Sequence, residues 1–318
     1  MSKKIVILKP RLDVTFKYFG PVAFERKPIE PIRLYWKNFI DLIKVEHEKN
    51  NEIVEVIEKP LWEFNINFVK KLNFEKIYIP HHSVETFDKQ KELKGVSYYM
   101  QMVFPWLFQV DNLGWCASAS NWPIKPLKNS NDETYKNYQK LAFSGLSKFD
   151  QPARKKIKFD QSFIVFLCQI TNDETIRLHS DISVKDALIK TLDFAKTKNI
   201  QVIVKPHPLN RQNMKPLGRI VLDRINKGEN ILWARNINIH DLLENCEAVF
   251  TVNSGSGMEA LLHKKPVYCY GRSEYASVSH YILDDEINWP ERKKYIRYYE
   301  DFFEAYVKSM INVKIKSL

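Results

Sequence analysis

Long apolar runs are absent from this 318-residue sequence, and glycine and cysteine are scarce. No run reaches the roughly 18 apolar residues of a membrane-spanning helix, and no signal peptide is evident at the N-terminus. Nine glycines are too few for a fibrous repeat, and the four cysteines lack the Cys-x-x-Cys spacing of a zinc site. We therefore expect an ordered globular protein of the cytoplasm, with reduced cysteines and no bound metal.

Length and charge narrow the organisation of the chain and its partners. A chain of this length suits two domains of ordinary size. Its formal charge of +11 would attract nucleic acids, anionic lipid surfaces, or anionic sugars and nucleotides. No RNA-binding signature is visible, so we expect no nucleic-acid partner. A nonenzymatic basic protein that binds RNA or a membrane remains the alternative from a different class.

The second half of the sequence alternates predicted strands and helices. Five short apolar segments have the composition of strands that are buried on both faces of a parallel sheet: 163–168, 201–204, 231–234, 248–252 and 266–270. Three segments between them are predicted helices: 183–198, 239–246 and 256–263. This alternation indicates a doubly wound, nucleotide-binding type of domain.

The first half of the sequence is less regular, although an α/β layout still fits. Strands are predicted at 4–8, 53–57 and 76–79, and a helix at 32–49. We interpret the aromatic stretch 98–108 as the wall of a cleft, and the polar, basic stretch 129–160 as a linker or domain edge.

We therefore divide the chain into three parts. An α/β domain is predicted at 1–150, a Rossmann-like domain at 151–288, and a helical segment at 289–318. The last segment is rich in lysine, arginine and tyrosine. We expect its helix to cross back onto the first domain or to touch a membrane surface, with a solvated helix face as the plain alternative.

Polar or small residues follow four predicted strands of the second domain: Gln169, His207, Asn253 and Gly271. Ligands of open parallel sheets bind at the carboxyl ends of the strands, so these residues should converge on one edge. Asp173 should reach the same edge, where a carboxylate acts as base, nucleophile or ribose acceptor. The plain alternative is that Asp173 caps a loop or the next helix.

Two motifs at this edge have the chemistry of a phosphate site. Prolines fix the backbone around His207 in Lys205-Pro206-His207-Pro208, and the histidine and the lysine can both donate to phosphate oxygens. Asn253-Ser254-Gly255-Ser256-Gly257 opens a helix with small residues, which let backbone N–H groups approach an anion, but it is neither a P-loop nor a dinucleotide fingerprint. Glu259 follows as a ribose acceptor or as an ordinary helix-start residue.

The first half offers its own candidates for contact with a second substrate. Asp111 follows the aromatic stretch, and His81 and His82 follow a predicted strand. A carboxylate or an imidazole could deprotonate a hydroxyl group there. Adjacent strand residues point to opposite faces, so at most one of the two histidines faces a site. Surface loop positions are the alternative for all three residues.

Three motifs together resemble the capsule and O-antigen β-Kdo glycosyltransferases, Kdo being 3-deoxy-D-manno-oct-2-ulosonic acid. The motifs are Gln169-x-x-x-Asp173, Lys205-x-His207-Pro208 and Asn253-Ser254-x-x-Gly257-x-Glu259. The resemblance implies a GT-B-like α/β fold with two Rossmann-type domains that face a central cleft, the acceptor in the N-terminal domain and the donor in the C-terminal one. The N-terminal half lacks the acidic Gly-Tyr stretch of capsule-linker members, which favours an O-antigen-type enzyme or a free-standing module.

The resemblance also implies the reaction, which is transfer of Kdo from CMP-Kdo to a saccharide or lipid-linked glycan acceptor with retention of configuration. Asp173 would be the nucleophile, and His207 with Lys205 would hold the CMP phosphate. Gln169 would position Asp173 or the donor carboxylate, and we assign Asp111 as the base of the second step. The cradle for the phosphate and the cytidine ribose would consist of Asn253, Ser254, Gly255, Ser256 and Glu259.

The implied donor agrees with the absence of a metal motif. A nucleoside monophosphate leaving group needs charge stabilisation, and it carries no pyrophosphate for a divalent metal to neutralise. We therefore expect no cofactor, and peripheral contact with the inner face of the inner membrane. Two other GT-B-like enzymes remain alternatives, a sialyltransferase that uses CMP-sialic acid and a glycerophosphotransferase that uses CDP-glycerol. The Gln169-x-x-x-Asp173 element favours Kdo.

Overall fold

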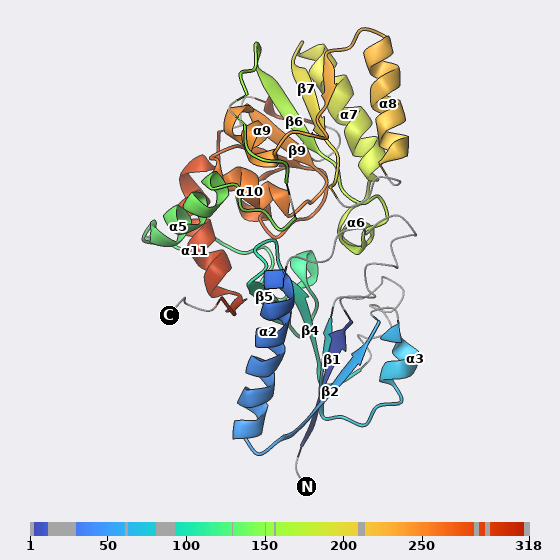
Figure 1. Cartoon of the computed structure of the whole chain (residues 1–318), viewed down its shortest axis with the longest axis vertical. Coiled ribbons are helices and arrows are strands. Elements are labelled where there is room, and N and C mark those ends of the chain that lie inside the picture. The colour runs from blue at the N-terminus through green and yellow to red at the C-terminus, as the bar shows by residue number, and fades with distance from the viewer. Residues whose placement is uncertain are drawn as a thin grey trace. The chain divides into compact units, whose positions relative to one another are not determined.

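The protein consists of two compact units, each built on a six-stranded sheet (Figure 1). The computed structural model describes residues 3–11, 30–60, 63–80, 93–128, 130–149, 151–155, 157–208, 214–282, 286–289 and 293–314. Unit 1 contains Met1–Trp122 and Val307–Leu318, and unit 2 contains Pro123–Tyr306. None of the helices in the described ranges is long and apolar enough to cross a bilayer.

The sheet of unit 2 is parallel throughout, in the order β11-β10-β9-β6-β7-β8. Its strands are β6 (Phe163–Leu167), β7 (Gln201–Lys205), β8 (Ile231–Trp233), β9 (Ala248–Thr251), β10 (Val267–Cys269) and β11 (His280–Tyr281). All residues of β6 and β9 are buried, as expected for central strands that are covered on both faces. The predicted doubly wound domain is confirmed.

Helices fill the connections between these strands. Between the strands lie α6 (Glu174–His179), α7 (Val184–Thr197), α8 (Lys215–Asn226), α9 (Ile239–Asn245) and α10 (Ser256–Leu262), whereas α5 (Glu133–Phe143) precedes β6 and α11 (Tyr299–Lys308) follows β11. Ser183 begins α7 as the sequence predicts, because its Oγ accepts from the N–H of Asp186 at 3.1 Å. Short 3-10 helices lie at Ala276–Val278 and Ile296–Tyr298.

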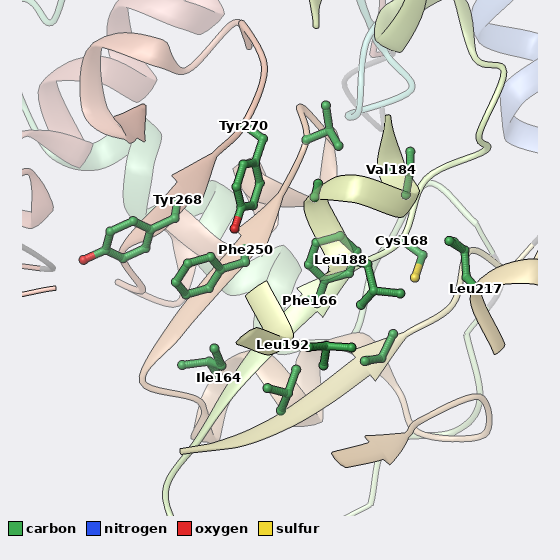
Figure 2. Close-up of a cluster of buried hydrophobic side chains, with 14 of the residues drawn as sticks. Ile164, Phe166, Cys168, Val184, Leu188, Leu192, Leu217, Phe250, Tyr268 and Tyr270 are labelled. Carbon is green, nitrogen blue, oxygen red and sulfur yellow. The ribbon is translucent and has the colours of Figure 1, made fainter. Parts of the chain in front are cut away.

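Apolar side chains of the sheet and of α7 form the core of unit 2. Figure 2 shows Phe166 of β6 and Phe250 of β9 in one cluster with Leu188 and Leu192 of α7. Each of these side chains is at most 1% exposed. Burial of one such side chain contributes about 1.5–3 kcal/mol to the free energy of folding. This core packs against β6 and β9, which are the strands from which the candidate site projects.

The sheet of unit 1 is mixed, in the order β12-β5-β4-β3-β1-β2. Its strands are β1 (Lys4–Pro10), β2 (Ile53–Lys59), β3 (Lys76–Pro80), β4 (Val96–Gln101), β5 (Leu107–Asp111) and β12 (Ile311–Asn312), with helices α2 (Glu30–Lys49) and α3 (Ile66–Val69) and a 3-10 helix at Cys116–Ser118. The first four strands along the chain run parallel, whereas β5 and β12 are antiparallel to their neighbours.

The aromatic stretch 98–108 is sheet core, which corrects its interpretation as a cleft wall. It spans most of β4 and the start of β5, which form an antiparallel pair. Tyr99 and Phe108 are fully buried, and Phe39 of α2 stacks on Phe108 with 4.3 Å between the ring centroids. The hydroxyl of Tyr99 donates to the carbonyl of Leu8 at 2.5 Å. Aromatic residues therefore fill the space between α2 and the sheet, where long apolar side chains are required.

The stretch 129–160 and the C-terminal segment differ from their predicted roles. The stretch contains α5, and the compact units divide between Trp122 and Pro123 and not near residue 150. Helix α5 belongs to unit 2, where Tyr135 donates to the carbonyl of Leu261 in α10 at 2.7 Å. Helix α11 packs within unit 2, where Phe303 meets Tyr135 with 5.4 Å between ring centroids. The element that returns to the sheet of unit 1 is the strand β12.

Candidate functional site

The register of the parallel sheet brings the four strand-end residues to one edge. Leu167, Lys205, Thr251 and Cys269 are the last residues of their strands and pair side by side across the sheet. Two positions beyond each of them stand Gln169, His207, Asn253 and Gly271. The four residues therefore occupy equivalent positions at the carboxyl edge, where ligands of such sheets bind.

Two amide side chains join the ends of β6 and β9. Nε2 of Gln169 donates to Oδ1 of Asn253 at 2.9 Å, and Oε1 of Gln169 accepts from the backbone N–H of Asn253 at 2.9 Å and from the hydroxyl of Thr251 at 3.2 Å. Nδ2 of Asn253 donates to the carbonyls of Thr175 at 2.9 Å and Arg272 at 3.3 Å. The Asn253 side chain thus braces three segments, and Gln169 directly positions Asn253.

Asp173 begins helix α6. Its Oδ1 accepts from the backbone N–H of Thr175 at 2.9 Å and from the hydroxyl of Thr175 at 2.6 Å. The helix-cap role that the sequence left open for Asp173 is therefore present. Because the carbonyl of Thr175 binds Asn253, hydrogen bonds connect Asp173 through Thr175 and Asn253 to Gln169. Two residues intervene between Gln169 and Asp173 in this series of bonds, and the role of Gln169 in positioning Asp173 stays a prediction.

His207 lies close enough to Asp173 for the two side chains to interact electrostatically. Burial lowers the pKa of His207 to about 4, the Asp173 carboxylate opposes this shift, and the charge of Lys148 adds to it. The ring of Phe149 meets the imidazole edge to face, with 5.4 Å between the centroids. The imidazole is therefore neutral near pH 7, and the charges of Asp173 and Lys148 act on it with opposite sign.

Lys205 is buried below this edge and binds backbone carbonyls. Its Nζ donates to the carbonyl of Ile237 at 2.6 Å and to that of Arg235 at 3.4 Å. Burial lowers the pKa of Lys205 to about 8. Both carbonyls belong to the loop between β8 and α9, so the contacts of Lys205 in the structure anchor this loop. Its contact with a phosphate stays a prediction.

A tyrosine fixes the turn between β9 and α10. The carbonyl of Ser254 accepts from the backbone N–H of Gly257 at 2.9 Å and from the hydroxyl of Tyr275 at 2.6 Å. A Cβ at position 257 would lie 2.1 Å from the Tyr275 oxygen. Glycine is therefore required here by the packing of Tyr275, and the approach of a ligand to this turn stays a prediction. Gly255 precedes the helix with helical φ and ψ, and the N–H of Ser256 donates to Oγ of Ser254 at 3.2 Å.

Glu259 faces a buried pair of histidines. It is 3% exposed, and its Oε1 lies 3.8 Å from Nε2 of His240. This nitrogen also contacts the carbonyl of Leu146 at 3.0 Å, and because a carbonyl only accepts, Nε2 carries the proton. Nδ1 of a neutral His240 then accepts from Nε2 of His263 at 3.0 Å, and burial lowers the pKa of His263 to about 3. The ribose contact of Glu259 stays a prediction.

Asp111 organises its own loop in unit 1. Its carboxylate accepts from the backbone N–H groups of Leu113 at 2.7 Å, Gly114 at 3.3 Å and Ser120 at 3.0 Å, and from the hydroxyl of Ser120 at 2.5 Å. The predicted candidates His81 and His82 lie outside the described residues. Within the described ranges, no group of three or more His, Cys, Asp or Glu side chains could hold a metal ion.

Four residues of this site were missed by the sequence interpretation: Lys148, Phe149, Thr175 and Tyr275. The spacing of Asp173 and Thr175 is that of a helix cap and its partner, so Thr175 could have been found. The other three reach the edge through tertiary contacts, and no local pattern indicates their position.

Comparisons with known proteins place the chain among proteins of capsule synthesis. The KpsS capsule polysaccharide export protein of Escherichia coli is 32% identical to it over 126 residues. The match covers 37% of this chain and 32% of KpsS, so it spans about a third of that relative.

Two solved structures share the fold, and both are named as KpsC transferases of Thermosulfurimonas dismutans. The β-Kdo 2,7 transferase has a TM-score of 0.53 and 16% identity, and the match covers 95% of this chain and 90% of that one. The β-Kdo 2,4 transferase has a TM-score of 0.52 and 17% identity, with 79% and 83% covered. At this identity the likeness concerns the fold, and it confirms the predicted GT-B-like class.

A family model decides the classification. The model described as capsule polysaccharide biosynthesis protein matches residues 129–315, which is more than half of the chain. The matched region contains the three motifs on which the resemblance rests. The family that matches is a capsule family, whereas the sequence of the N-terminal half favours an O-antigen-type enzyme. The chain belongs to the family of capsule polysaccharide biosynthesis proteins.

Proposed function

We propose that this protein is a retaining glycosyltransferase that moves Kdo from CMP-Kdo to a saccharide or lipid-linked glycan acceptor in capsule synthesis. The observation that carries the proposal is that Asp173 and His207 follow the adjacent strands β6 and β7 at the carboxyl edge of a nucleotide-binding type of sheet, where the Asp173 charge acts on the imidazole. Family membership supports the pathway. The names of the two KpsC transferases, which share the fold, support the sugar.

The first chemical step is attack by Asp173. Both hydrogen bonds from Thr175 are accepted by Oδ1, so we assign the attack on the anomeric carbon to Oδ2. A bond forms between Oδ2 and the carbon, the bond from the carbon to the phosphate oxygen breaks, and CMP leaves with the electron pair. The cap holds the carboxylate in a fixed orientation, which lowers the entropic part of the barrier.

The second step returns the sugar to its original configuration. The acceptor hydroxyl attacks the glycosyl ester from the face that CMP has vacated, the bond to Asp173 breaks, and a base takes the hydroxyl proton. Two inversions give net retention. Asp111 is our candidate for this base, and its carboxylate would have to exchange a bond to Ser120 for one to the acceptor.

Stabilisation of the departing phosphate is assigned to the residues around His207. The neutral imidazole can donate one N–H to a phosphate oxygen. Backbone N–H groups of the turn that Tyr275 fixes can add to this, since the turn is rigid before the ligand arrives. We expect no metal cofactor, and we propose that the acceptor is met at the inner face of the inner membrane.

Two assays test the proposal. Release of CMP is measured with a glycan acceptor and each of three donors in turn, CMP-Kdo, CMP-sialic acid and CDP-glycerol, because a glycerophosphotransferase also releases CMP when it transfers glycerol phosphate to its acceptor. Only CMP-Kdo should be consumed. If no glycan acceptor supports CMP release from CMP-Kdo, the proposed donor is wrong.

Intact-mass spectrometry tests the nucleophile. Wild-type protein incubated with CMP-Kdo should gain the mass of one Kdo residue, and Asp173→Ala should lose this adduct and the transfer activity. Asp173→Asn is the sharper variant, because asparagine keeps the helix cap but cannot form the glycosyl ester. Asp181→Ala, which changes an exposed aspartate on the same unit, should keep the adduct. An adduct that persists in Asp173→Asn would refute the role of Asp173.

A further inference from the structure

A segment between α5 and β6 is hydrogen-bonded to the start of helix α9. We call this segment the strap; its described residues are 144–149 and 151–155. Nε2 of His240 donates to the carbonyl of Leu146 at 3.0 Å, and Nδ2 of Asn238 donates to the carbonyl of Pro152 at 2.7 Å. His240 is fully buried and Asn238 is 3% exposed. Two buried polar side chains therefore bind the backbone of the strap at two points.

Phe149 lies between these two points. Leu146 is three residues before it and Pro152 is three residues after it. Three residues of extended chain span at most about 10 Å, so the two bonds confine the Phe149 backbone to a small region. A third bond acts on the later side, where Oε1 of Gln151 accepts from the backbone N–H of Ile239 at 3.3 Å. Tertiary hydrogen bonds on both sides thus restrict the position of Phe149.

The ring of Phe149 contacts the imidazole of His207. The two ring centroids lie 5.4 Å apart, and the interplanar angle of 67° is that of an edge-to-face pair. Aromatic rings prefer this arrangement over a face-to-face one. An imidazole can turn about its side-chain bonds, and only some of its orientations keep the contact. The Phe149 ring therefore favours one orientation of the imidazole, and both residues belong to unit 2.

This orientation matters for a group that donates to a phosphate. Prolines on either side of His207 restrict its backbone, but they leave the side chain free to turn. A ring N–H donates only along the direction of its own bond, so a rotated imidazole loses the phosphate oxygen. Both His207 and Phe149 keep partial exposure, so a ligand can still reach the imidazole. Phe149 supplies the side-chain constraint that the prolines do not.

We propose that Phe149 is a positioning residue for His207, and that the strap carries its ring so that the imidazole donates to the departing phosphate in one orientation. The inference rests on the proposed function, in which His207 stabilises the leaving phosphate. It gives a role in the reaction to a stretch that the sequence indicates only as a linker or domain edge. Phe149 acts through His207 and has no other part in the chemistry.

NMR of the protein without donor tests the contact. Wild type should show nuclear Overhauser contacts between the two rings. Phe149→Leu keeps an apolar side chain but removes the ring, so the pKa of His207 should rise from about 4 towards 6.5 as water reaches the imidazole, whereas Phe149→Tyr should keep it low. Phe143→Leu is the matched control, because the Phe143 ring meets another imidazole, that of His263, with 5.1 Å between centroids. Absence of the ring contacts in wild type, or an unchanged His207 pKa in Phe149→Leu, would overturn the proposal.

Transfer kinetics test the positioning. Phe149→Leu should lower kcat and kcat/KM by the same factor of about 10 to 100, because a small misplacement acts on the transition state. Phe149→Tyr should restore most of the rate, and Phe143→Leu should match wild type. In a His207→Ala background, Phe149→Leu should have little further effect, since no imidazole is left to position. A further loss as large as that in the wild-type background would show that Phe149 acts independently of His207, against the proposal.

Asn238→Asp tests the part played by the strap. Aspartate keeps the helix cap, because Oδ1 of Asn238 accepts from the N–H of His240 at 2.8 Å, but it cannot donate to the carbonyl of Pro152. The His207 pKa and kcat should change in the same direction as in Phe149→Leu, by smaller amounts. If both keep their wild-type values, the strap does not position the ring.

The positioning and the proposed donor fail in different experiments. If wild type transfers no Kdo from CMP-Kdo but the NMR results are as expected, the proposed function is wrong and the positioning of the imidazole stands. If wild type transfers Kdo and Phe149→Leu is equally active, the proposed function stands and the positioning role falls.

Discussion

Substitution of Asn253 by aspartate tests whether this side chain braces the site. The change is isosteric, so packing is preserved and only the chemistry of one atom differs. Nδ2 of Asn253 donates to the carbonyls of Thr175 and Arg272. In Asn253→Asp a carboxylate oxygen would face these two carbonyl oxygens. The bond accepted from Gln169 would remain.

The expected loss of stability follows from the two donated bonds. A buried acceptor that loses its donor costs about 1–3 kcal/mol, and Asn253 is 5% exposed. Two such acceptors and a buried charge give an expected loss of about 2–5 kcal/mol near pH 8. Such a loss is a large share of the roughly 5–15 kcal/mol by which natural domains are stable.

The pH dependence gives this prediction its second test. Burial and the facing carbonyls should raise the folded-state pKa of the new carboxyl above its unfolded value of about 3.9. Folding therefore favours the protonated form, which can donate one bond. The loss of stability should be full above the folded-state pKa and should shrink as pH falls through it.

Urea denaturation near pH 8 and near pH 5 measures both effects against wild type. Asn253→Ala should also be destabilised, but its loss should not depend on pH, because alanine does not titrate. A loss in Asn253→Asp below about 0.5 kcal/mol would refute the brace, since a side chain that faces solvent or ligand tolerates the charge. A pH-independent loss would show that the new carboxyl is not buried against the two carbonyls.

Two further predictions concern the turn and the imidazole. Gly257→Ala should lower the free energy of unfolding, measured by urea denaturation, by about 1–3 kcal/mol, because its Cβ would lie 2.1 Å from Tyr275. The control Gly218→Ala in α8 should be neutral or stabilising. Equal effects of the two substitutions would contradict the packing of Gly257 against Tyr275. His207 should titrate near 4 by NMR, and lower still in Asp173→Asn; a midpoint near 6.5 would contradict its burial. Since its folded-state pKa is depressed, the stability that His207 contributes should be lost as pH falls from about 6.5 towards 4.

The elements of unit 2 follow from the sequence because each carries a local signal. Strands β6, β7 and β9 are apolar runs buried on both faces, and their predicted ends lie within one residue of the observed ones. The convergence of Gln169 and His207 follows in turn, because parallel strands that are in register end at one edge.

Local sequence patterns do not predict the strand order of unit 1, because that order depends on pairing between strands far apart in the sequence. The aromatic stretch 98–108 has the composition of a binding surface and of a core alike, and only the pairing of β4 with β5 and the cover from α2 decide between them. The pairing of β12 with β5 joins segments about 200 residues apart, so a local sequence pattern cannot indicate it.

The same limit applies to the partners of the site residues. The sequence assigns Asn253 to a ligand because its chemistry suits one, but it does not indicate that Gln169 and Thr175, about 80 residues away, also bind this side chain. Residue type predicts what a side chain can bind, and tertiary structure decides which partner it finds.

The pairing of β12 with β5 has a consequence for the order in which the protein is made. Phe108 leaves the ribosome about 200 residues before Ile311, its partner in the sheet. At roughly 5–20 residues per second, strand β5 waits about 10–40 s for this neighbour, with an open row of backbone N–H and C=O groups. All of unit 2 emerges during that interval. The nascent N-terminal unit therefore presents an unpaired β edge until residues 311 and 312 have been made, and a chaperone that covers such edges would act on it during this interval.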